Sequence, residues 1–156
     1  RGMVVHPLKR SLPDRQYTSM IVTCADYRLH LPGGLAAHLE DTALIHAISG
    51  FPRIREEGVF DWEELKEIVR ASMRKSIREI HLVGHTDCGG YMGDDCALLR
   101  PDLNLATGVV AGEFHGTIHV HLAHVHPCGV SRLERVDSHH GHRPLHAHEG
   151  FDAPAA

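Results

Sequence analysis

The chain has 156 residues, of which 42% are hydrophobic and 23% charged, and its formal net charge is −4. This composition predicts one globular domain, and it excludes a collagen, a coiled coil and a disordered chain. The mildly acidic balance argues against nucleic-acid binding, and the lack of an apolar run of roughly 20 residues argues against a membrane span. The composition stands out in one respect, 16 His beside 4 Cys, because these residue types are the usual zinc ligands.

The cysteines are expected to be reduced. A chain of this length folds without disulfides, and the sequence shows no secretion leader, so we expect a cytoplasmic protein. Metal binding or catalysis then explains the cysteines better than a disulfide scaffold does.

An irregular N-terminal arm is predicted over residues 1–18, because the segment is polar and interrupted by Pro7 and Pro13. A short helix is predicted over 35–40, after a Pro-Gly-Gly break. Three short apolar runs rich in β-branched residues are typical of strands covered on both faces. They span residues 19–24, 42–48 and 79–84.

A longer helix is predicted between the second and third of these strands. Asp61 as N-cap and Glu64 three residues later resemble a capping box, and apolar residues then recur at helical spacing as far as Met73. A strand, a helix and a strand joined in this way indicate a right-handed crossover in a parallel sheet. The predicted fold class is therefore α/β.

The rest of the chain is predicted to add a helix near 104–114 and a hairpin of strands over 117–126 and 130–136. The expected architecture is a mostly parallel central sheet flanked by helices, with an antiparallel hairpin at its C-terminal edge. The zinc-binding domain is assigned to residues 19–136. Residues 137–156 are rich in His, Gly, Pro and Ala, which predicts a flexible tail.

Chemically active side chains follow two of the predicted buried strands. Cys24, Asp26 and Arg28 have the spacing i, i+2 and i+4, so an extended chain points all three the same way. His85 and Cys88 follow a second strand. Because open α/β sheets bind ligands at the carboxyl ends of parallel strands, Cys24, His85 and Cys88 are expected to converge on one metal ion.

This donor set is typical of catalytic zinc, with two thiolates, one imidazole and an open fourth position. Cys96 remains a rival fourth ligand, which would close the site into a structural one. Asp26 fits a catalytic site better, since its carboxylate can accept a hydrogen bond from zinc-bound water while Arg28 holds it with a bidentate fork. Taken singly, Cys24 is more often a core residue and Asp26–Arg28 a surface ion pair, but their joint occurrence favours zinc.

The two motifs resemble those of a known family. Residues 24–28 read CADYR, similar to the Cys-x-Asp-x-Arg motif of the β-class carbonic anhydrases. Residues 84–89 read GHTDCG, similar to that family's His-x-x-Cys-Gly motif. The resemblance runs over residues 20–91, with a weaker echo over 117–136, and two separated motifs in the same order make it specific.

The resemblance implies a zinc lyase (carbonate dehydratase) that interconverts carbon dioxide and bicarbonate on an α/β fold, as a homodimer or a multiple of dimers. It implies Cys24, His85 and Cys88 as zinc ligands, with Asp26 and Arg28 as the catalytic dyad. In some family members the aspartate itself takes the fourth zinc position. The expected reaction is attack of a zinc-bound hydroxide, oriented by Asp26, on carbon dioxide, which gives bicarbonate and a proton.

The sequence departs from the family between the two motifs. Family members usually carry Arg or Lys followed by Asn-Ala-Gly-Asn after the second strand, whereas residues 46–51 read HAISGF and keep only the Gly. The metal ligands are unaffected by this change, but the substrate pocket differs from the usual one. The candidate pocket residues are His46, Gly50, Phe51 and Gly89.

This departure leaves two other functions open. A more apolar pocket, with Ile48 and Phe51, would favour hydrolysis of carbonyl sulfide or carbon disulfide on the same zinc site. The other alternative is a zinc-binding domain without turnover, which acts in assembly or metal handling. A small-molecule substrate is expected for both enzymatic functions, and neither nucleic acid nor a membrane is expected as a partner.

The remaining histidines form two groups. In the predicted hairpin, i, i+2 pairs among His119, His121, His124 and His126 share a face. A second metal site is conceivable there, but a solvated strand is favoured because no Cys or carboxylate pattern completes a coordination sphere. The tail histidines are interpreted as solvated, although such tracts bind metals weakly. Cys128, in the turn of the hairpin, is expected to be a bystander thiol.

Overall fold

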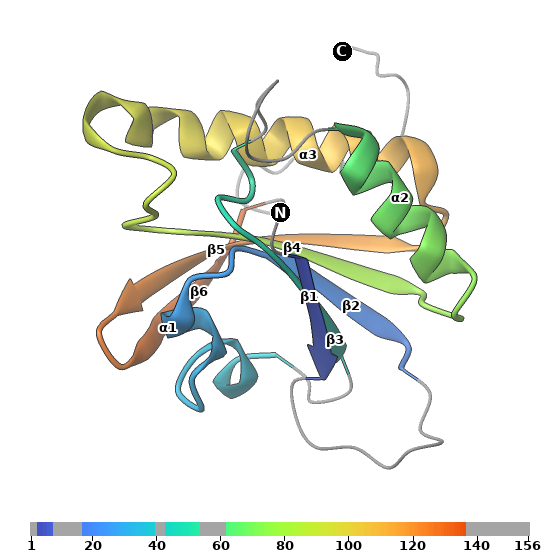
Figure 1. The fold of residues 1–156 in the computed structure, drawn as a ribbon, viewed down its shortest axis with the longest axis horizontal. Coiled ribbons are helices and arrows are strands. Elements are labelled where there is room, and N and C mark those ends of the chain that lie inside the picture. The colour runs from blue at the N-terminus through green and yellow to red at the C-terminus, as the bar shows by residue number, and fades with distance from the viewer. Residues whose placement is uncertain (1–2, 8–16, 40–42, 54–61, 137–156) are drawn as a thin grey trace.

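A six-stranded mixed sheet forms the centre of the fold, which a computed structural model describes for residues 3–7, 17–39, 43–53 and 62–136 (Figure 1). The strands lie side by side in the order β1-β3-β2-β4-β5-β6. In chain order they are β1 (Met3–Pro7), β2 (Ser19–Thr23), β3 (Ala43–Ile48), β4 (Glu79–His85), β5 (Thr117–His126) and β6 (Gly129–Arg135).

The four inner strands run parallel, and the two edge strands run antiparallel to their neighbours. β2 pairs in parallel with both β3 and β4, and β4 pairs in parallel with β5. β1 pairs antiparallel with β3, and β6 antiparallel with β5. The predicted α/β class, the mostly parallel sheet and the hairpin at its C-terminal edge are therefore confirmed.

Helices lie on both faces of the sheet. Figure 1 shows α2 and α3 on one face and α1 on the other. Every residue of β2 is consequently buried, which explains its continuous apolar sequence. The helical segments are α1 (Tyr27–His30), the 3-10 turn η1 (Leu35–Ala37), α2 (Trp62–Met73), the 3-10 segment η2 (Gly93–Leu98) and α3 (Leu99–Glu113).

The two longer helices supply one side of the core. α2 buries Leu65, Ile68 and Val69, the apolar stripe that its sequence predicts. α3 lies against α2, β4 and β5, and it buries Leu103 and Val110 completely. No helix within the described residues has the length and hydropathy that crossing a membrane requires.

The segment predicted as an irregular arm contains a strand. All five residues of β1 pair with β3, so this part of the prediction is wrong. The prolines misled it, because Pro7 stands at the end of an edge strand, where a missing N–H is tolerated. The short helix predicted over 35–40 is a single 3-10 turn over Leu35–Ala37.

α3 begins at Leu99, earlier than the predicted start near residue 104. Pro101 stands in its first turn, where a backbone N–H has no helical acceptor, so the proline does not interrupt the helix. Asp61, the predicted N-cap of α2, lies outside the described residues, as does the tail over 137–156.

The register between β2 and β4 brings two strand ends together at one edge of the sheet. Thr23 pairs with Val83, and its hydroxyl donates a hydrogen bond of 2.9 Å to the Val83 carbonyl. β4 continues to His85, one residue further than predicted, by pairing with Ala123 of β5. Cys24, the residue after β2, therefore lies beside the end of β4.

The turn that joins β5 to β6 requires a glycine. Gly129 has a φ of +147°, and a Cβ built there would lie 2.2 Å from the carbonyl oxygen of Gly33. We expect Gly129→Ala to lower the free energy of unfolding by roughly 2–3 kcal/mol, measured by urea denaturation. Gly112→Ala is the matched control, because its Cβ meets nothing within 4 Å on α3, and it should raise stability by up to about 1 kcal/mol. Equal losses in the two variants would contradict the prediction.

Glu134 of β6 ties the hairpin to α3. It accepts hydrogen bonds from His124 at 2.9 Å and from Arg100 at 3.1 Å, and these partners lower its pKa. The unfolded chain has a glutamate pKa of about 4.3, and the folded chain has a lower one. The ionised Glu134 therefore stabilises the fold fully above the unfolded pKa, and this stabilisation is lost as pH falls through the folded pKa. Glu134→Gln should therefore cost up to about 1 kcal/mol at pH 7 and nothing in strong acid.

Chemical denaturation at several pH values measures this difference. Glu67→Gln is the control, because Glu67 forms an exposed ion pair with Arg70 within α2 and its loss should change stability by less than about 0.5 kcal/mol. A Glu134→Gln deficit that persists unchanged in acid would contradict the assignment.

Candidate metal centre

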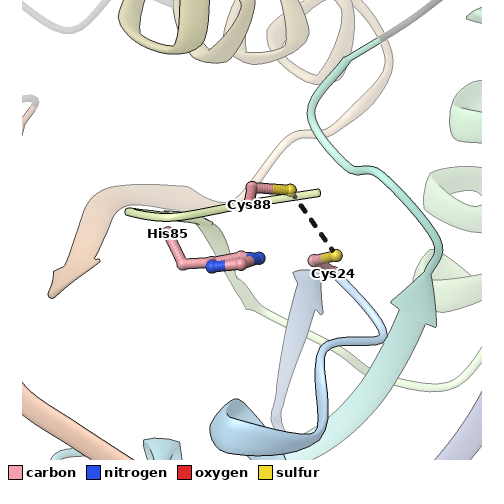
Figure 2. Close-up of side chains that lie close together, drawn as sticks. All are labelled: Cys24, His85 and Cys88. Carbon is pink, nitrogen blue, oxygen red and sulfur yellow. Dashed lines mark hydrogen bonds between the residues drawn. The ribbon is translucent and has the colours of Figure 1, made fainter. Parts of the chain in front are cut away.

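Two cysteines and a histidine meet at the carboxyl edge of the sheet (Figure 2). Cys24 follows β2, His85 is the last residue of β4, and Cys88 lies in the turn after β4. All three are buried, and His85 has no exposed surface. In Figure 2 the two sulfur atoms face each other, and the His85 ring lies beside them. The predicted convergence of these three side chains is observed.

The distances suit a tetrahedral zinc ion. The Sγ atoms of Cys24 and Cys88 lie 4.0 Å apart. Two sulfur ligands of tetrahedral zinc, each about 2.3 Å from the metal, are separated by about 3.8 Å. The ligand atoms of all three residues lie within 4.8 Å of one another, so small side-chain rotations suffice to bind an ion.

The His85 ring is oriented for coordination. Its Nδ1 donates a hydrogen bond of 2.7 Å to the backbone carbonyl of Thr86, which assigns the proton to Nδ1 and leaves Nε2 as the acceptor. Nε2 is buried and has no hydrogen-bond partner among the described residues. A buried acceptor without a partner is costly, and a metal ion would satisfy it. The Nδ1 hydrogen bond to Thr86 is of the kind that orients a metal-bound imidazole.

The two thiols share a hydrogen bond that favours one thiolate. The pKa of Cys24 is lowered, chiefly because Cys88 donates to it, with a further contribution from His85 against the effect of burial. The pKa of Cys88 is raised, because losing a second proton would leave two thiolates side by side in a buried place. A divalent cation removes this conflict, since it replaces the remaining proton between the sulfurs.

Backbone amides approach both sulfur atoms. The N–H of Gly90 donates to Cys88 Sγ at 3.4 Å, and the N–H of Gly50 lowers the pKa of Cys24 by a hydrogen bond. Gly50 has a φ of +83°, which favours glycine at this turn. These amide donors would partly offset the negative charge of two metal-bound thiolates, as hydrogen bonds to metal ligands commonly do.

A charged clamp stands on one side of the three ligands. Arg28 donates to both carboxylate oxygens of Asp26, from Nε at 3.0 Å and from Nη2 at 2.8 Å, and its backbone N–H adds a third bond. These hydrogen bonds lower the pKa of Asp26. Oδ2 of Asp26 lies 4.0 Å from His85 Nε2, so an ionised carboxylate is held beside the ligand cluster.

Asp87 completes this clamp, which the sequence analysis did not anticipate. Nη1 of Arg28 donates to its carboxylate at 2.9 Å, and Nη2 donates to its carbonyl at 3.0 Å. Asp87 has a φ of +55°, a conformation that aspartate tolerates better than most residues. Its position between His85 and Cys88 was the available signal, but no periodicity indicated that it would face Arg28.

A second residue without a sequence signal is Arg53. It is buried, donates from Nη1 to the carbonyl of Gly90 at 2.7 Å, and lies over the ring of Tyr91. Arg53 thereby holds the turn that carries Cys88. Only the folded chain brings the residue after the cis peptide Phe51–Pro52 to this turn.

The rival ligand Cys96 lies elsewhere. It is exposed in η2, and it is not part of the buried group formed by Cys24, His85 and Cys88. Cys128 is exposed in the β5–β6 turn, where the sequence places a bystander thiol.

The four predicted pocket residues occupy different environments. Gly50 lies against Cys24, as described above, and Phe51 is completely buried next to it in the chain. Gly89 is exposed, with open space where a Cβ would stand. His46 lies within β3, where burial lowers its pKa. Their role in a substrate pocket stays a prediction.

Comparison with solved structures shows a likeness in fold. No protein-family model and no curated protein matches the chain. The crystal structure of carbonic anhydrase from Streptococcus mutans is similar, with a TM-score of 0.51 over 82% of this chain and 87% of that one. The two sequences are 20% identical, so the likeness concerns the fold.

Zinc affinity is expected to depend on both buried cysteines. Cys24→Ser and Cys88→Ser should each weaken zinc binding by at least about 100-fold, because a serine hydroxyl does not replace a thiolate ligand. Competition with a chromophoric chelator measures the affinity. Cys96→Ser is the matched control and should keep the affinity of the unchanged chain.

Zinc should also stabilise the fold. A ligand that binds only the folded state adds about 4 kcal/mol at a free concentration of roughly 1,000 times its Kd. A chelator is therefore expected to lower the Tm of the unchanged chain and of Cys96→Ser, but not that of Cys88→Ser. A loss of zinc in Cys96→Ser as large as in Cys88→Ser would contradict this ligand set.

Proposed function

We propose that the chain is a zinc enzyme of the β-class carbonic anhydrase type, which interconverts carbon dioxide and bicarbonate. One observation carries the proposal: the Asp26–Arg28 clamp lies at the same strand edge as the three buried donors, with Asp26 Oδ2 4.0 Å from His85 Nε2. The resemblance of both motifs and the fold shared with a carbonic anhydrase support it.

The residues present fit zinc by donor type, spacing and the buried, unpartnered nitrogen of His85. Cys24, His85 and Cys88 would hold the ion and leave one position open. When bound, zinc acts as a Lewis acid that makes hydroxide available near neutral pH. The remaining chemistry belongs to the side chains around that open position.

Asp26 is suited to orient the attacking oxygen. Arg28 donates one hydrogen bond to Oδ2 and two to Oδ1. An ionised carboxylate can accept about four hydrogen bonds in all. The remaining direction of Oδ2 can accept the O–H of the nucleophile, which aims the oxygen lone pair at the carbon of carbon dioxide. Attack forms the C–O bond of bicarbonate, and the proton removed from water passes to solvent.

Arg28 keeps Asp26 in this role. It fixes the carboxylate through a bidentate contact, and Asp87 holds the guanidinium from the other side. The hydrogen bonds from Arg28 also lower the pKa of Asp26, so the carboxylate stays an acceptor at neutral pH. Arg28 is in this sense a positioning residue.

The remaining parts of the proposal concern the setting of the enzyme. We include assembly as a homodimer or a multiple of dimers and a cytoplasmic location, as the sequence analysis expects. Carbonyl sulfide and carbon disulfide are linear analogues of carbon dioxide that the same zinc site would hydrolyse, and a zinc domain without turnover would act on none of the three.

Parallel assays of zinc-loaded protein separate these functions. We expect fast hydration of carbon dioxide, followed by stopped flow with a pH indicator, and slow or no release of hydrogen sulfide from the two sulfur compounds. Preferential sulfide release would show that a sulfur compound, and not carbon dioxide, is the substrate. Full zinc content without any turnover would overturn the proposal that the chain is an enzyme.

Substitutions of Asp26 and Arg28 should affect turnover and spare zinc. Asp26→Asn is expected to lower kcat/KM for hydration by about 100-fold, because an amide cannot serve as the same ionised acceptor. Arg28→Lys keeps the charge but loses the bidentate contact, so a loss of about 10-fold is expected. Asp87→Asn, at a side chain that is 79% exposed, should change kcat/KM by less than about 3-fold.

Zinc content is measured for each of these variants, so that a loss of metal is not mistaken for a loss of orientation. Asp26→Asn with full zinc content and unchanged kcat/KM would contradict the role given to Asp26.

A further inference from the structure

Three histidines and a glutamate gather on one face of β4 and β5, away from the proposed catalytic centre. His81 pairs in register with His119, and each strand adds a second residue two positions away. Residues at i and i+2 of a strand share a face, so Glu79 and His81 lie on the same face as His119 and His121. The sequence pattern points only to the histidines of β5, because the pairing with β4, which supplies the carboxylate, is not visible in it.

This cluster is separate from the candidate metal centre. Glu79 begins β4, and His85 ends it. At about 3.3 Å per residue, the two positions lie roughly 20 Å apart along the strand. The inference is therefore independent of the proposed function.

The donor atoms are close to the spacing that a metal requires. His119 Nε2 lies 3.3 Å from Glu79 Oε1, and His81 Nε2 lies 3.9 Å from the same oxygen. All three ligand atoms lie within 4.8 Å of one another. Ligands about 2.0–2.2 Å from a shared ion stand about 3.0–3.5 Å apart, so the His119–Glu79 pair already fits and the His81–Glu79 pair must close by about 0.5 Å.

Glu79 can provide that movement. Its side chain is 51% exposed at the beginning of the strand, whereas those of His81 and His119 are 16% and 23% exposed. The two histidine rings thus form the half-buried floor of the cluster, and the carboxylate of Glu79 lies on its solvent-exposed side. An ion would enter from solvent there and keep water in its remaining positions.

His121 orients the ring of His81 at the buried side of the cluster. Its Nε2 lies 3.1 Å from His81 Nδ1. In the tautomer of His81 that carries its proton on Nδ1, this proton is donated to His121, and Nε2 is left to bind an ion beside Glu79. Metal-bound histidines commonly make such a hydrogen bond with the ring nitrogen that does not bind the metal, and it fixes their tautomer. The rings of His81 and His119 are stacked, with centroids 4.7 Å apart, which fixes their relative orientation.

The chemistry of the cluster favours a metal over a network of charges. Protonation of both stacked rings would place two like charges beside a single carboxylate, whereas a divalent ion lets two neutral rings and one carboxylate act as ligands. Two imidazoles and one carboxylate suit borderline divalent ions such as zinc, cobalt and nickel. The donor set contains no thiolate, unlike the first centre.

We propose that Glu79, His81 and His119 form a second binding site for a divalent transition-metal ion, with His121 as the residue that orients His81.

Titration of the 156-residue chain, loaded beforehand with a single equivalent of zinc, with Ni²⁺ tests this site by calorimetry. We expect His81→Gln/His119→Gln to bind one equivalent of Ni²⁺ fewer than the unchanged chain. The matched control is His115→Gln/His126→Gln, which removes two exposed histidines outside the cluster and should keep the full stoichiometry. Tail histidines are present in every chain compared, so their binding cancels.

A second variant leaves the rings in place. Glu79→Gln removes only the exposed carboxylate, and it should weaken the binding of the same equivalent of Ni²⁺ by about 10-fold. The far-ultraviolet circular dichroism spectrum and the Tm report whether each variant is folded. Unchanged Ni²⁺ stoichiometry in a folded His81→Gln/His119→Gln chain overturns the proposal, as does unchanged affinity in Glu79→Gln.

Discussion

The parallel pairing of β2 with β4 is the constraint on which the candidate centre depends. Because Thr23 stands opposite Val83, both strands end at the same edge, and the chain beyond each end supplies one half of the donor set. β2 is followed by a cysteine, an aspartate and an arginine, and β4 ends in a histidine followed by a cysteine. A shift of this register by one residue would reverse the face of each side chain and separate the ligands.

Charge balance then decides how the centre is arranged. A second thiolate would repel both the first thiolate and the half-buried carboxylate of Asp26, and backbone amides donate to the sulfurs while a guanidinium binds the carboxylate. Arg28 is shared between Asp26 and Asp87, so the turn after β4 is tied to the turn after β2. The same contacts that neutralise charge therefore also fix geometry, which is what orientation of a small substrate requires.

Sequence patterns anticipated most of the fold and the convergence of Cys24, His85 and Cys88, and the exceptions have physical reasons. The strands around Cys24 and His85 were predictable because strands buried on both faces are continuously apolar. β1, which reads MVVHP, was missed because Pro7 and the polar residues after it mask this short apolar run, although an edge strand tolerates proline. The early start of α3 was missed because Pro101 is harmless in a first turn.

By itself, the sequence determined the α/β class and identified Cys24, His85 and Cys88 as candidate ligands, since motif spacing and apolar runs are local properties. Only the tertiary structure decided which distant residues meet. Asp87 reaches Arg28, and Glu79 reaches His119, through turns and strand register that no local pattern specifies. The alternation of side chains along a strand shows which residues share its face, but pairing between strands determines their neighbours.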